Sequence, residues 1–598
     1  MRVGRGAIAL ALISLAFVWL AACRRSPDEV RPRTAATGTQ ADLTEWFTDR
    51  AAESGLSHVH FNGMSGELYY SEIMAPGVAL LDYDNDGDLD VFLVQGRMLG
   101  PGKKPADALL PPEGPGPIGG RLYRNDLEVH ADGSRTLRFT DVTAASGIKA
   151  LGYGMGAAAA DFNNDGCVDL YLTNFGPGQL LRNNCDGTFS DVPGIPEAAG
   201  AVPTWAVSAS FLDFDRDGWL DLFVGHYLNY SIETNIRCFL QSGAPNYCPP
   251  QVYGAQPSRL YHNNRDGTFT DVTAATGMAT EFGPTLGVST ADFNGDGWID
   301  LYVANDGQPN QLWINQRNGT FKNTALLAGT AIGEAGRAKS SMGVDAGDFD
   351  NDGDEDLIVT NLTGQGSDIY VNDGSGVFEE QSARTGIRVP SLPLTGFGVG
   401  WLDYDNDGWP DVLTVNGTVT RDPQRPQELF SLQQRRQLLH NLGHGRFEDV
   451  TAQAGALFQQ AEVGRGAAFG DIDNDGDTDI VVANDAGPVR LLINNVGNRN
   501  HWIGLRLTSG PLPGASSGSG RDMLGARVGI TRSDGTTLWR RARSDGSYAS
   551  ANDPRVLAGL GPAAAAAAVK VAWPGGRIEE FVNVAVDRYT TLSEGSGR

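Results

Sequence analysis

Short apolar runs alternate along most of this chain with clusters of glycine, asparagine and aspartate, a pattern typical of β-strands joined by tight turns. One stretch illustrates the arrangement. Residues 206–214 lead into an acidic loop, residues 220–224 leave it, and further strand-like segments follow at 260–264 and 268–273. A unit of this kind predicts four antiparallel strands.

The unit recurs along the chain, which indicates a repeat architecture. Its third segment is an apolar stretch ending in asparagine, at Asn125, Asn183, Asn263, Asn315, Asn372, Asn441 and Asn494. Seven units of four strands predict an all-β fold, a seven-bladed β-propeller over residues 44–497.

The fourth segment has no copy after the last unit. Copies containing phenylalanine follow the first six acidic loops, at Phe139, Phe189, Phe269, Phe321, Phe378 and Phe447. A spare copy, residues 46–49, precedes the first loop. We therefore expect this N-terminal strand to complete the seventh blade, because closing the ring leaves no unpaired sheet edge.

The first two strands of each unit are joined by a nine-residue loop, DxDxDGxxD, whose third position is sometimes asparagine. Side chains at positions 1, 3, 5 and 9 and the carbonyl of position 7 can converge on one hard cation, while the glycine permits the bend. An all-oxygen ligand set indicates calcium rather than zinc or copper. A single acidic turn needs no metal, but repetition in one register favours a structural ion.

The loops imply up to seven structural calcium ions. Their predicted ligands, with position 7 acting through its carbonyl, are Asp82, Asp84, Asp86, Asp88 and Asp90; Asp161, Asn163, Asp165, Cys167 and Asp169; Asp213, Asp215, Asp217, Trp219 and Asp221; Asp292, Asn294, Asp296, Trp298 and Asp300; Asp348, Asp350, Asp352, Asp354 and Asp356; Asp403, Asp405, Asp407, Trp409 and Asp411; and Asp471, Asp473, Asp475, Asp477 and Asp479. Loops two and four lack a carboxylate at position 3 and are expected to bind calcium more weakly.

Composition and charge are consistent with this interpretation. The chain has 598 residues, 41% hydrophobic content and 78 glycines, which suits turn-rich β structure better than disorder. The formal net charge is −26, and a large share of the 72 acidic residues lies in the loops. Bound calcium would offset much of this charge. The acidic balance and the lack of a basic stripe argue against nucleic acid as a partner.

The N-terminus predicts export. Arg2 and Arg5 precede an uncharged run at 7–22, which is short for a membrane span and suits a secretory signal. The run ends in Leu-Ala-Ala before Cys23, which resembles a bacterial lipobox. We expect residues 1–22 to be a lipoprotein signal peptide, Cys23 to be lipidated and residues 23–43 to form a tether, with the protein at the outer membrane or cell surface. An ordinary cleaved signal is the alternative.

Four further cysteines remain, an even number in an exported chain. We pair them locally, Cys167 with Cys185 and Cys238 with Cys248, although the sequence leaves other pairings open.

The repeats resemble the FG-GAP/VCBS repeats of integrin-like propellers. The following region, residues 498–598, resembles the ASPIC/UnbV domain that accompanies such repeats in the cartilage acidic protein family, through His501-Trp502-Ile503-Gly504, Gly525-Ala526-Arg527-Val528, Trp573-Pro574-Gly575-Gly576 and Tyr589-Thr590-Thr591-Leu592. The resemblance implies adhesion- or matrix-type binding, in a bacterial lipoprotein form, and names no partner.

The three longest inserts, about 97–120, 226–258 and 417–437, all join strands two and three, at the blade end opposite the calcium loops. This end is the predicted ligand-binding face. Its candidate contact residues are Trp205, Tyr230, Tyr247, Tyr253 and Phe282. The alternative is that these aromatic residues pack the inserts.

No catalytic residue is assigned. The chain has no HExxH or phosphate-loop motif, and neither Glu72 nor Glu462 has an identifiable partner. His262 and His440 occupy a slot that holds Arg, Ile or Val in other repeats, and we interpret both as structural. The leading hypothesis is a calcium-binding, surface-anchored propeller lipoprotein that recognises a protein or glycan. The alternatives are a polysaccharide-acting hydrolase or lyase and an envelope-assembly scaffold.

Overall fold

The computed structural model describes residues 45–112, 118–193, 195, 204–420, 432–510, 520–562 and 566–598. The predicted signal peptide, Cys23 and the tether lie outside the described residues, so those expectations stay predictions. Thr44–Arg598 form one compact unit. In the described residues, no helix is both long and apolar enough to span a bilayer.

The unit contains seven four-stranded antiparallel sheets among its described residues, one for each predicted repeat. We number these blades by their acidic loops, and the strands run from the innermost outward. Blade one is β2 (Val78–Leu81), β3 (Asp90–Leu93), β4 (Arg121–Asn125) and β7 (Phe139–Asp141); blade two is β8 (Gly154–Ala160), β9 (Asp169–Asn174), β10 (Gln179–Asn183) and β11 (Phe189–Asp191). Blade three is β12 (Ala206–Leu212), β13 (Asp221–His226), β16 (Arg259–Asn263) and β17 (Phe269–Asp271); blade four is β18 (Thr285–Ala291), β19 (Asp300–Asn305), β20 (Gln311–Asn315) and β21 (Phe321–Asn323). Blade five is β22 (Ser341–Gly347), β23 (Asp356–Asn361), β24 (Asp368–Asn372) and β25 (Phe378–Glu380); blade six is β26 (Gly396–Leu402), β27 (Asp411–Asn416), β29 (Gln437–Asn441) and β30 (Phe447–Asp449). Blade seven is β32 (Gly464–Gly470), β33 (Asp479–Asn484), β34 (Arg490–Asn494) and β1 (Phe47–Asp49).

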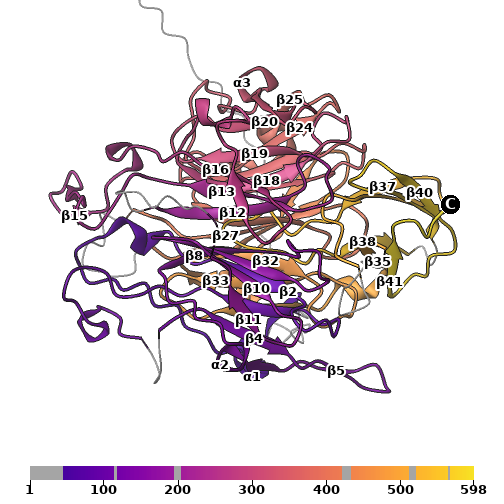
Figure 1. Ribbon diagram of the computed structural model, residues 1–598, viewed down its shortest axis with the longest axis horizontal. Coiled ribbons are helices and arrows are strands. Elements are labelled where there is room, and N and C mark those ends of the chain that lie inside the picture. Colours follow the sequence, from indigo (N-terminus) through magenta and orange to yellow (C-terminus); the bar gives the residue numbers. More distant parts are fainter. Residues whose placement is uncertain are drawn as a thin grey trace, which may run out of the picture. The chain divides into compact units, whose positions relative to one another are not determined.

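The innermost strands contact one another in a closed ring. Each blade's first strand touches the first strand of the next blade, and β32 of blade seven touches β2 of blade one. Figure 1 shows the sheets of the blades between β15 on one side and the C-terminal strands on the other. The predicted all-β propeller is confirmed.

The ring closes through the N-terminal strand, as the missing fourth segment predicts. β1 pairs antiparallel with β34, with Phe47 opposite Asn494 and Asp49 opposite Leu492. Phe47 is fully buried in the core shared by blades six and seven.

One asparagine per blade ties neighbouring blades together. The asparagine that ends the third strand is buried, and its Nδ2 donates a hydrogen bond of 2.7–3.0 Å to the carbonyl of loop position 2 in the preceding blade. This bond occurs in all seven blades, and in blade one Asn125 reaches Ile472 of blade seven. The recurring asparagine therefore closes a second, hydrogen-bonded ring.

Short elements decorate the blades. The helices in the described residues have four residues each: α1 (Ala51–Ser54), α2 (Thr143–Ser146), α3 (Ala325–Ala328), α4 (Ser382–Thr385) and α5 (Arg388–Ser391). Short 3-10 helices occur at Tyr70–Ile73, Pro105–Asp107, Pro250–Val252, Met278–Thr280, Ala456–Gln459 and Gly497–Arg499. Two-stranded pairs are β5 (Glu128–Val129) with β6 (Arg135–Thr136), β14 (Cys238–Phe239) with β15 (Pro245–Asn246), and β28 (Gln434–Arg435) with β31 (Ala461–Glu462).

The C-terminal region forms two sheets around one hydrophobic core. One sheet has the order β38 (Val556–Gly561), β35 (His501–Thr508) and β41 (Tyr589–Ser593), and the other has β37 (Thr537–Arg541), β36 (Arg527–Arg532), β39 (Ala566–Ala572) and β40 (Ile578–Phe581). These strands lie together at one side of Figure 1, far from the β14–β15 hairpin.

Residues 543–553, between β37 and β38, enter the propeller along its axis. We call them the axial segment. They hydrogen-bond the innermost strand of every blade: β2 through Ala551, β8 and β12 through Ala549, β18 through Asp545, β22 and β26 through Ser547, and β32 through Asp553. Tyr548 is fully buried, and its hydroxyl donates to the Met74 carbonyl at 2.7 Å. The axial segment therefore fills the centre of the ring.

Candidate metal centres and their surroundings

The seven acidic loops adopt one backbone conformation. Their position-6 glycines have φ between 84° and 104°, the left-handed region that favours glycine. In loops two to seven, both oxygens of the first aspartate accept backbone N–H groups of positions 5 and 6, at 2.7–3.2 Å. The motif therefore folds the loop around its first carboxylate.

The ninth-position aspartates are fully buried in all seven loops. One oxygen accepts the N–H of the third-strand asparagine at 2.7–2.9 Å in each blade. In six loops the other oxygen accepts the N–H of position 2, at 2.9–3.2 Å. This residue thus joins the loop to the blade and turns a carboxylate toward the loop interior.

Several buried carboxylate oxygens in the loops have no hydrogen-bond partner. They are Asp82 Oδ1, Asp356 Oδ2, Asp405 Oδ1 and Asp477 Oδ1. Buried carboxylate oxygens are rarely left unpaired. Carboxylate oxygens of Asp82, Asp84 and Asp86 lie within 4.8 Å of one another, and so do those of Asp213, Asp215 and Asp221. A hard divalent cation fits this donor set.

Burial and mutual repulsion perturb these carboxyl groups. Burial, aided by the charge of Asp165, raises the pKa of Asp161 to about 7, and burial, aided by Asp475 and Asp473, raises the pKa of Asp471 to about 8. Crowded carboxylates of this kind are stabilised by nearby positive charge.

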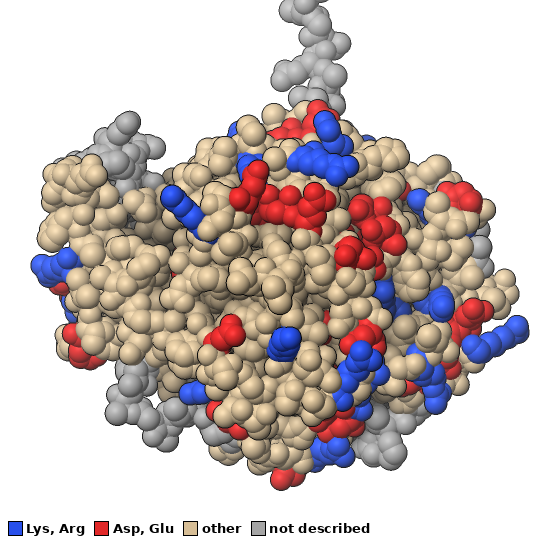
Figure 2. All heavy atoms as spheres, turned by 90° about the horizontal axis from the view of Figure 1, so that it is seen from above, with Lys and Arg blue, Asp and Glu red and all other residues tan. Residues whose placement is uncertain are grey.

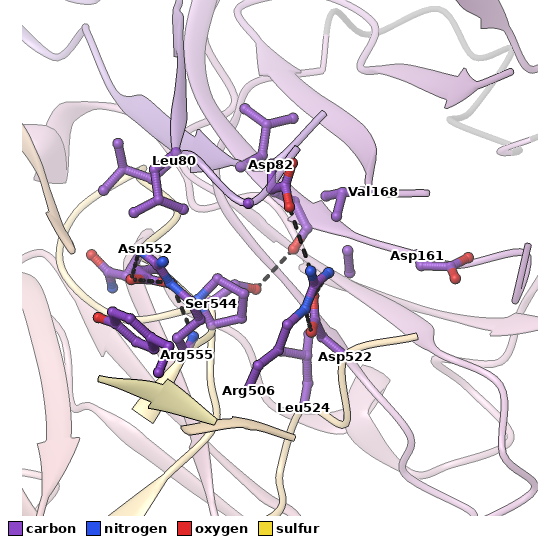
Figure 3. Close-up of a pocket in the computed structure, with 18 of the residues that line it drawn as sticks. Leu80, Asp82, Asp161, Val168, Arg506, Asp522, Leu524, Ser544, Asn552 and Arg555 are labelled. Carbon is purple, nitrogen blue, oxygen red and sulfur yellow. Dashed lines mark hydrogen bonds and ion pairs between the residues drawn. The ribbon is translucent and has the colours of Figure 1, made fainter. Parts of the chain in front are cut away.

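The C-terminal domain supplies positive charge to the loops. Arg506 on β35 places Nη1 3.4 Å from Asp82 Oδ2. Figure 3 marks this contact with a dashed line. Arg540 on β37 donates to Asn351 Oδ1 of loop five at 3.1 Å and to the Gly408 carbonyl of loop six at 3.0 Å. Arg555 donates to the Asp471 carbonyl and to Asn474 Oδ1 of loop seven, both at 2.7 Å.

Together with Arg521 and Arg527, these arginines reach all seven loops. Burial raises the pKa of the first aspartate in every loop, and the charge of one of the five arginines opposes that rise. Nothing local in the sequence marks an arginine that faces a loop in a different domain, so these interactions were not predicted.

Between the C-terminal domain and blades one and two lies a cavity of about 270 Å³, drawn in Figure 3. Leu80, Leu89, Val168 and Leu524 form much of its apolar wall. Its polar end holds Arg506, which also contacts Asp522 at 2.8 Å within its own domain. The cavity thus adjoins the first acidic loop.

Position 4 links the loops to one another. It holds asparagine in loops one, two, five, six and seven, with φ of 54° to 60°. In loops one, two, five and six its Nδ2 donates to the position-6 carbonyl of the next loop at 2.9–3.1 Å. In loop seven Asn474 donates to Asp88 of loop one at 2.7 Å. The recurrence of asparagine at position 4 was the sequence feature from which this loop-to-loop hydrogen bond could have been predicted.

The asparagines at position 3 of loops two and four, and the two strand histidines, also have partners within the loops. In loops two and four, the amides of Asn163 and Asn294 donate to the position-5 carboxylates at 2.8 and 3.1 Å. His262 Nε2 lies 3.0 Å from Asp215 Oδ2, and His440 Nδ1 lies 3.0 Å from Asp411 Oδ1. A hydrogen bond to Asp411 raises the pKa of His440 to about 9. Both histidines thus contact a loop carboxylate rather than merely filling a strand position.

Both predicted disulfides are present. Cys167 bonds Cys185 and Cys238 bonds Cys248, with Cα atoms 5.7 and 5.1 Å apart.

The predicted ligand face needs correction. Trp205, Tyr230, Tyr247 and Tyr253 are buried in one aromatic core cluster, where they cannot contact a partner. The alternative prediction, that these aromatic residues pack the inserts, holds for Tyr230, Tyr247 and Tyr253, which belong to the 226–258 insert and are buried. Phe282 is 46% exposed.

The two glutamates without a predicted partner also have one. The carboxylate of Glu462 pairs with Arg490 at 2.6 Å and with Arg436. Glu72 is fully buried, and its Oε2 accepts the Tyr247 hydroxyl at 3.1 Å. These contacts join segments far apart in the chain, so spacing alone did not reveal them.

The face of the molecule in Figure 2 carries acidic side chains in groups beside basic ones, with a wide uncharged area between them. On this face, charges of both signs are mixed.

Comparison with known families agrees with the repeats and the C-terminal fold. Five segments match the FG-GAP-like repeat, at residues 161–224, 252–303, 292–359, 348–414 and 427–482. Residues 516–598 match the ASPIC and UnbV domain. The chain is an FG-GAP-repeat β-propeller protein with a C-terminal ASPIC/UnbV domain.

Its curated relatives include cartilage acidic protein 1. The Homo sapiens protein is 25% identical over 297 residues, which are 47% of this chain and 40% of that protein. The Xenopus tropicalis protein is 24% identical over 362 residues, 58% and 49% of the two chains. The chain therefore spans less than half the length of these relatives.

Solved structures similar to this chain include an Agrocybe aegerita lectin described for recognition of non-reducing terminal N-acetylglucosamine, with a TM-score of 0.35 and 15% identity, covering 63% of this chain and 79% of the lectin. The Dos1 propeller has a TM-score of 0.35 and 9% identity, with 74% and 96% covered.

Proposed function

We propose that the protein is an exported, calcium-stabilised propeller that binds a protein or glycan through the blade end bearing the long inserts. The observation that carries the calcium assignment is the set of buried, unpaired carboxylate oxygens in loops of one conformation. In the same proposal, Cys23 carries a lipid anchor.

The recognition role rests on how the two blade ends are used. The C-terminal domain docks at the end with the acidic loops, and the inserts extend from the other end. There the disulfide-bonded β14–β15 hairpin presents Phe239, 62% exposed, and the flanking segments present Ile236 and Val252, 44% and 43% exposed. Exposed apolar side chains on a braced loop are typical of recognition surfaces. The axial position that a propeller hydrolase would use is filled by the axial segment, so no observation favours the enzyme alternative.

Calcium is tested by metal content and melting. We expect up to seven calcium ions per chain by equilibrium dialysis and elemental analysis, and a lower melting temperature in chelator. At about 1 mM calcium and a dissociation constant near 0.1 mM, each loop contributes about 1.4 kcal/mol. A chain with no bound calcium and an unchanged melting temperature would reject the assignment.

Recognition is tested on a glycan array and by pull-down with surface proteins of the same cell, in calcium. Phe239→Ser should weaken a captured interaction at least tenfold. Ile578→Ser is the matched control, because Ile578 is 58% exposed on β40 of the C-terminal domain, which docks at the opposite blade end. Equal binding by the wild type and Phe239→Ser would show that the hairpin is not the contact, and turnover of a glycan would favour the enzyme alternative.

A further inference from the structure

The arginines that reach the acidic loops come from a domain that is itself inserted into the propeller. Arg506 lies on β35, Arg540 on β37 and Arg555 next to β38, and the axial segment between β37 and β38 bonds all seven innermost strands. The domain is thus held with its guanidinium groups at the loops, as Figure 3 shows for Arg506 and Asp82.

Arg540 is the sharpest case. Its guanidinium bridges two neighbouring loops, through Asn351 at 3.1 Å and the Gly408 carbonyl at 3.0 Å. The carboxylates whose charge acts on it, Asp348, Asp403 and Glu355, all belong to the propeller. Arg506 and Arg555, by contrast, also contact an aspartate of their own domain, Asp522 or Asp553.

A guanidinium and a divalent cation placed at the same carboxylates repel each other. The positive charge stabilises the crowded aspartates when the loop is empty more than when a cation already neutralises them. By linkage, whatever stabilises the empty loop more than the filled one weakens cation binding by the same free energy.

We propose that the arginines of the C-terminal domain compete with calcium for the loop carboxylates, so that docking of this domain lowers calcium affinity and keeps the propeller folded when the loops are empty. The inference rests on the proposed calcium binding. On this proposal, the C-terminal domain supplies positive charge to the loops, and the calcium affinity of the protein depends on both domains.

The test uses the full-length purified chain and terbium, whose luminescence is sensitised by a nearby tryptophan. Trp409 occupies position 7 of loop six, so the part of the signal that Trp409→Phe removes reports that loop. Calcium is then titrated against bound terbium in the wild type, Arg540→Gln, Arg540→Lys and Arg577→Gln. Arg577 is the matched control, because its side chain is 58% exposed and faces Glu594 of its own domain.

In Arg540→Gln, the calcium concentration that displaces half of the loop-six terbium should fall about three- to tenfold. The same variant should show a larger difference in melting temperature between calcium and chelator than the wild type. Arg540→Lys keeps the charge and should stay within about twofold of the wild type, as should Arg577→Gln.

Unchanged or weaker calcium binding in Arg540→Gln would overturn the competition, and so would an Arg540→Lys variant that matches Arg540→Gln. If Arg540→Gln does not fold in chelator, Arg506→Gln gives a second measurement through the calcium dependence of its melting temperature. A wild type that binds neither terbium nor calcium would instead reject the proposed calcium function, and the competition with it.

Discussion

At the scale of single residues, the repeat reuses a few polar side chains for two purposes. The third-strand asparagine accepts a turn N–H while its amide reaches the neighbouring blade, and the ninth loop aspartate anchors the loop to the same asparagine. Because these groups are buried, each bond lost leaves an unpaired partner behind.

Asn263 tests this role. Its Nδ2 donates to the carbonyls of Phe162 and Leu220 at 2.8 and 2.9 Å. Asn263→Ala should lower the free energy of unfolding by about 2 to 4 kcal/mol in urea denaturation, because two buried carbonyls lose their donor. The exposed neighbour is the control: Asn264→Ala should cost less than about 0.5 kcal/mol. Equal losses in the free energy of unfolding for the two variants would show that the inter-blade hydrogen bond has no special role.

Glu72 makes stability depend on pH. Burial raises its pKa from 4.5 to about 8, the Tyr247 hydroxyl opposes this, and the charge of Asp485 adds to it. The unfolded chain loses the proton near pH 4.5 and the folded protein near pH 8. The stability contributed by the protonated carboxyl is therefore full below pH 4.5 and is lost as pH rises to 8.

Glu72→Gln removes this titration. Thermal unfolding of wild type and variant should agree near pH 4.5, whereas at pH 9 the variant should be more stable by roughly 3 to 5 kcal/mol. A difference that does not grow between pH 5 and 8 would contradict the assignment.

At the scale of elements, strands and loops follow from local patterns, while pairings between distant segments follow from topology. The pairing of the N-terminal strand with blade seven is an exception. Sequence alone predicted this distant pairing, because the count of fourth segments left one blade incomplete. The Cys238–Cys248 insert was predicted as an element, but Tyr230, Tyr247 and Tyr253 around it are buried in one core cluster, while Phe239 stays exposed.

Phe47 tests the closure. It is fully buried on β1, where it pairs with Asn494 and packs against Phe458. Phe47→Ala should cost about 3 to 5 kcal/mol and should speed hydrogen exchange in β34 before it affects β24 of blade five. Uniform exchange across the blades would mean that the ring does not open at this seam.

At the scale of the whole molecule, the C-terminal domain is part of the propeller rather than an appendage. The axial segment gives every blade a shared partner, so the blades and the domain are expected to unfold together.

Tyr548 tests this coupling. Its ring packs edge-on against Phe397 with centroids 4.9 Å apart. Tyr548→Ala should cost about 3 to 5 kcal/mol and split a single calorimetric transition into two, one for each domain. A single transition lowered in temperature would show that the other axial contacts suffice to couple the domains.

The sequence by itself determined the strands, the repeat and the acidic loops, because each depends on spacing within one or two units. The closing strand followed from the count of fourth segments, and the two local disulfides were predicted among pairings that the sequence left open. Only the tertiary structure decided which aromatic rings are buried, which acids are paired and what faces the loops. Those outcomes depend on contacts such as Arg540 with Asn351 or Ser547 with Val344, between residues more than 180 positions apart, for which no local pattern exists. The acidic loops can therefore be recognised in the sequence. The arginines that face them can be identified only from the tertiary structure, because they come from the C-terminal domain.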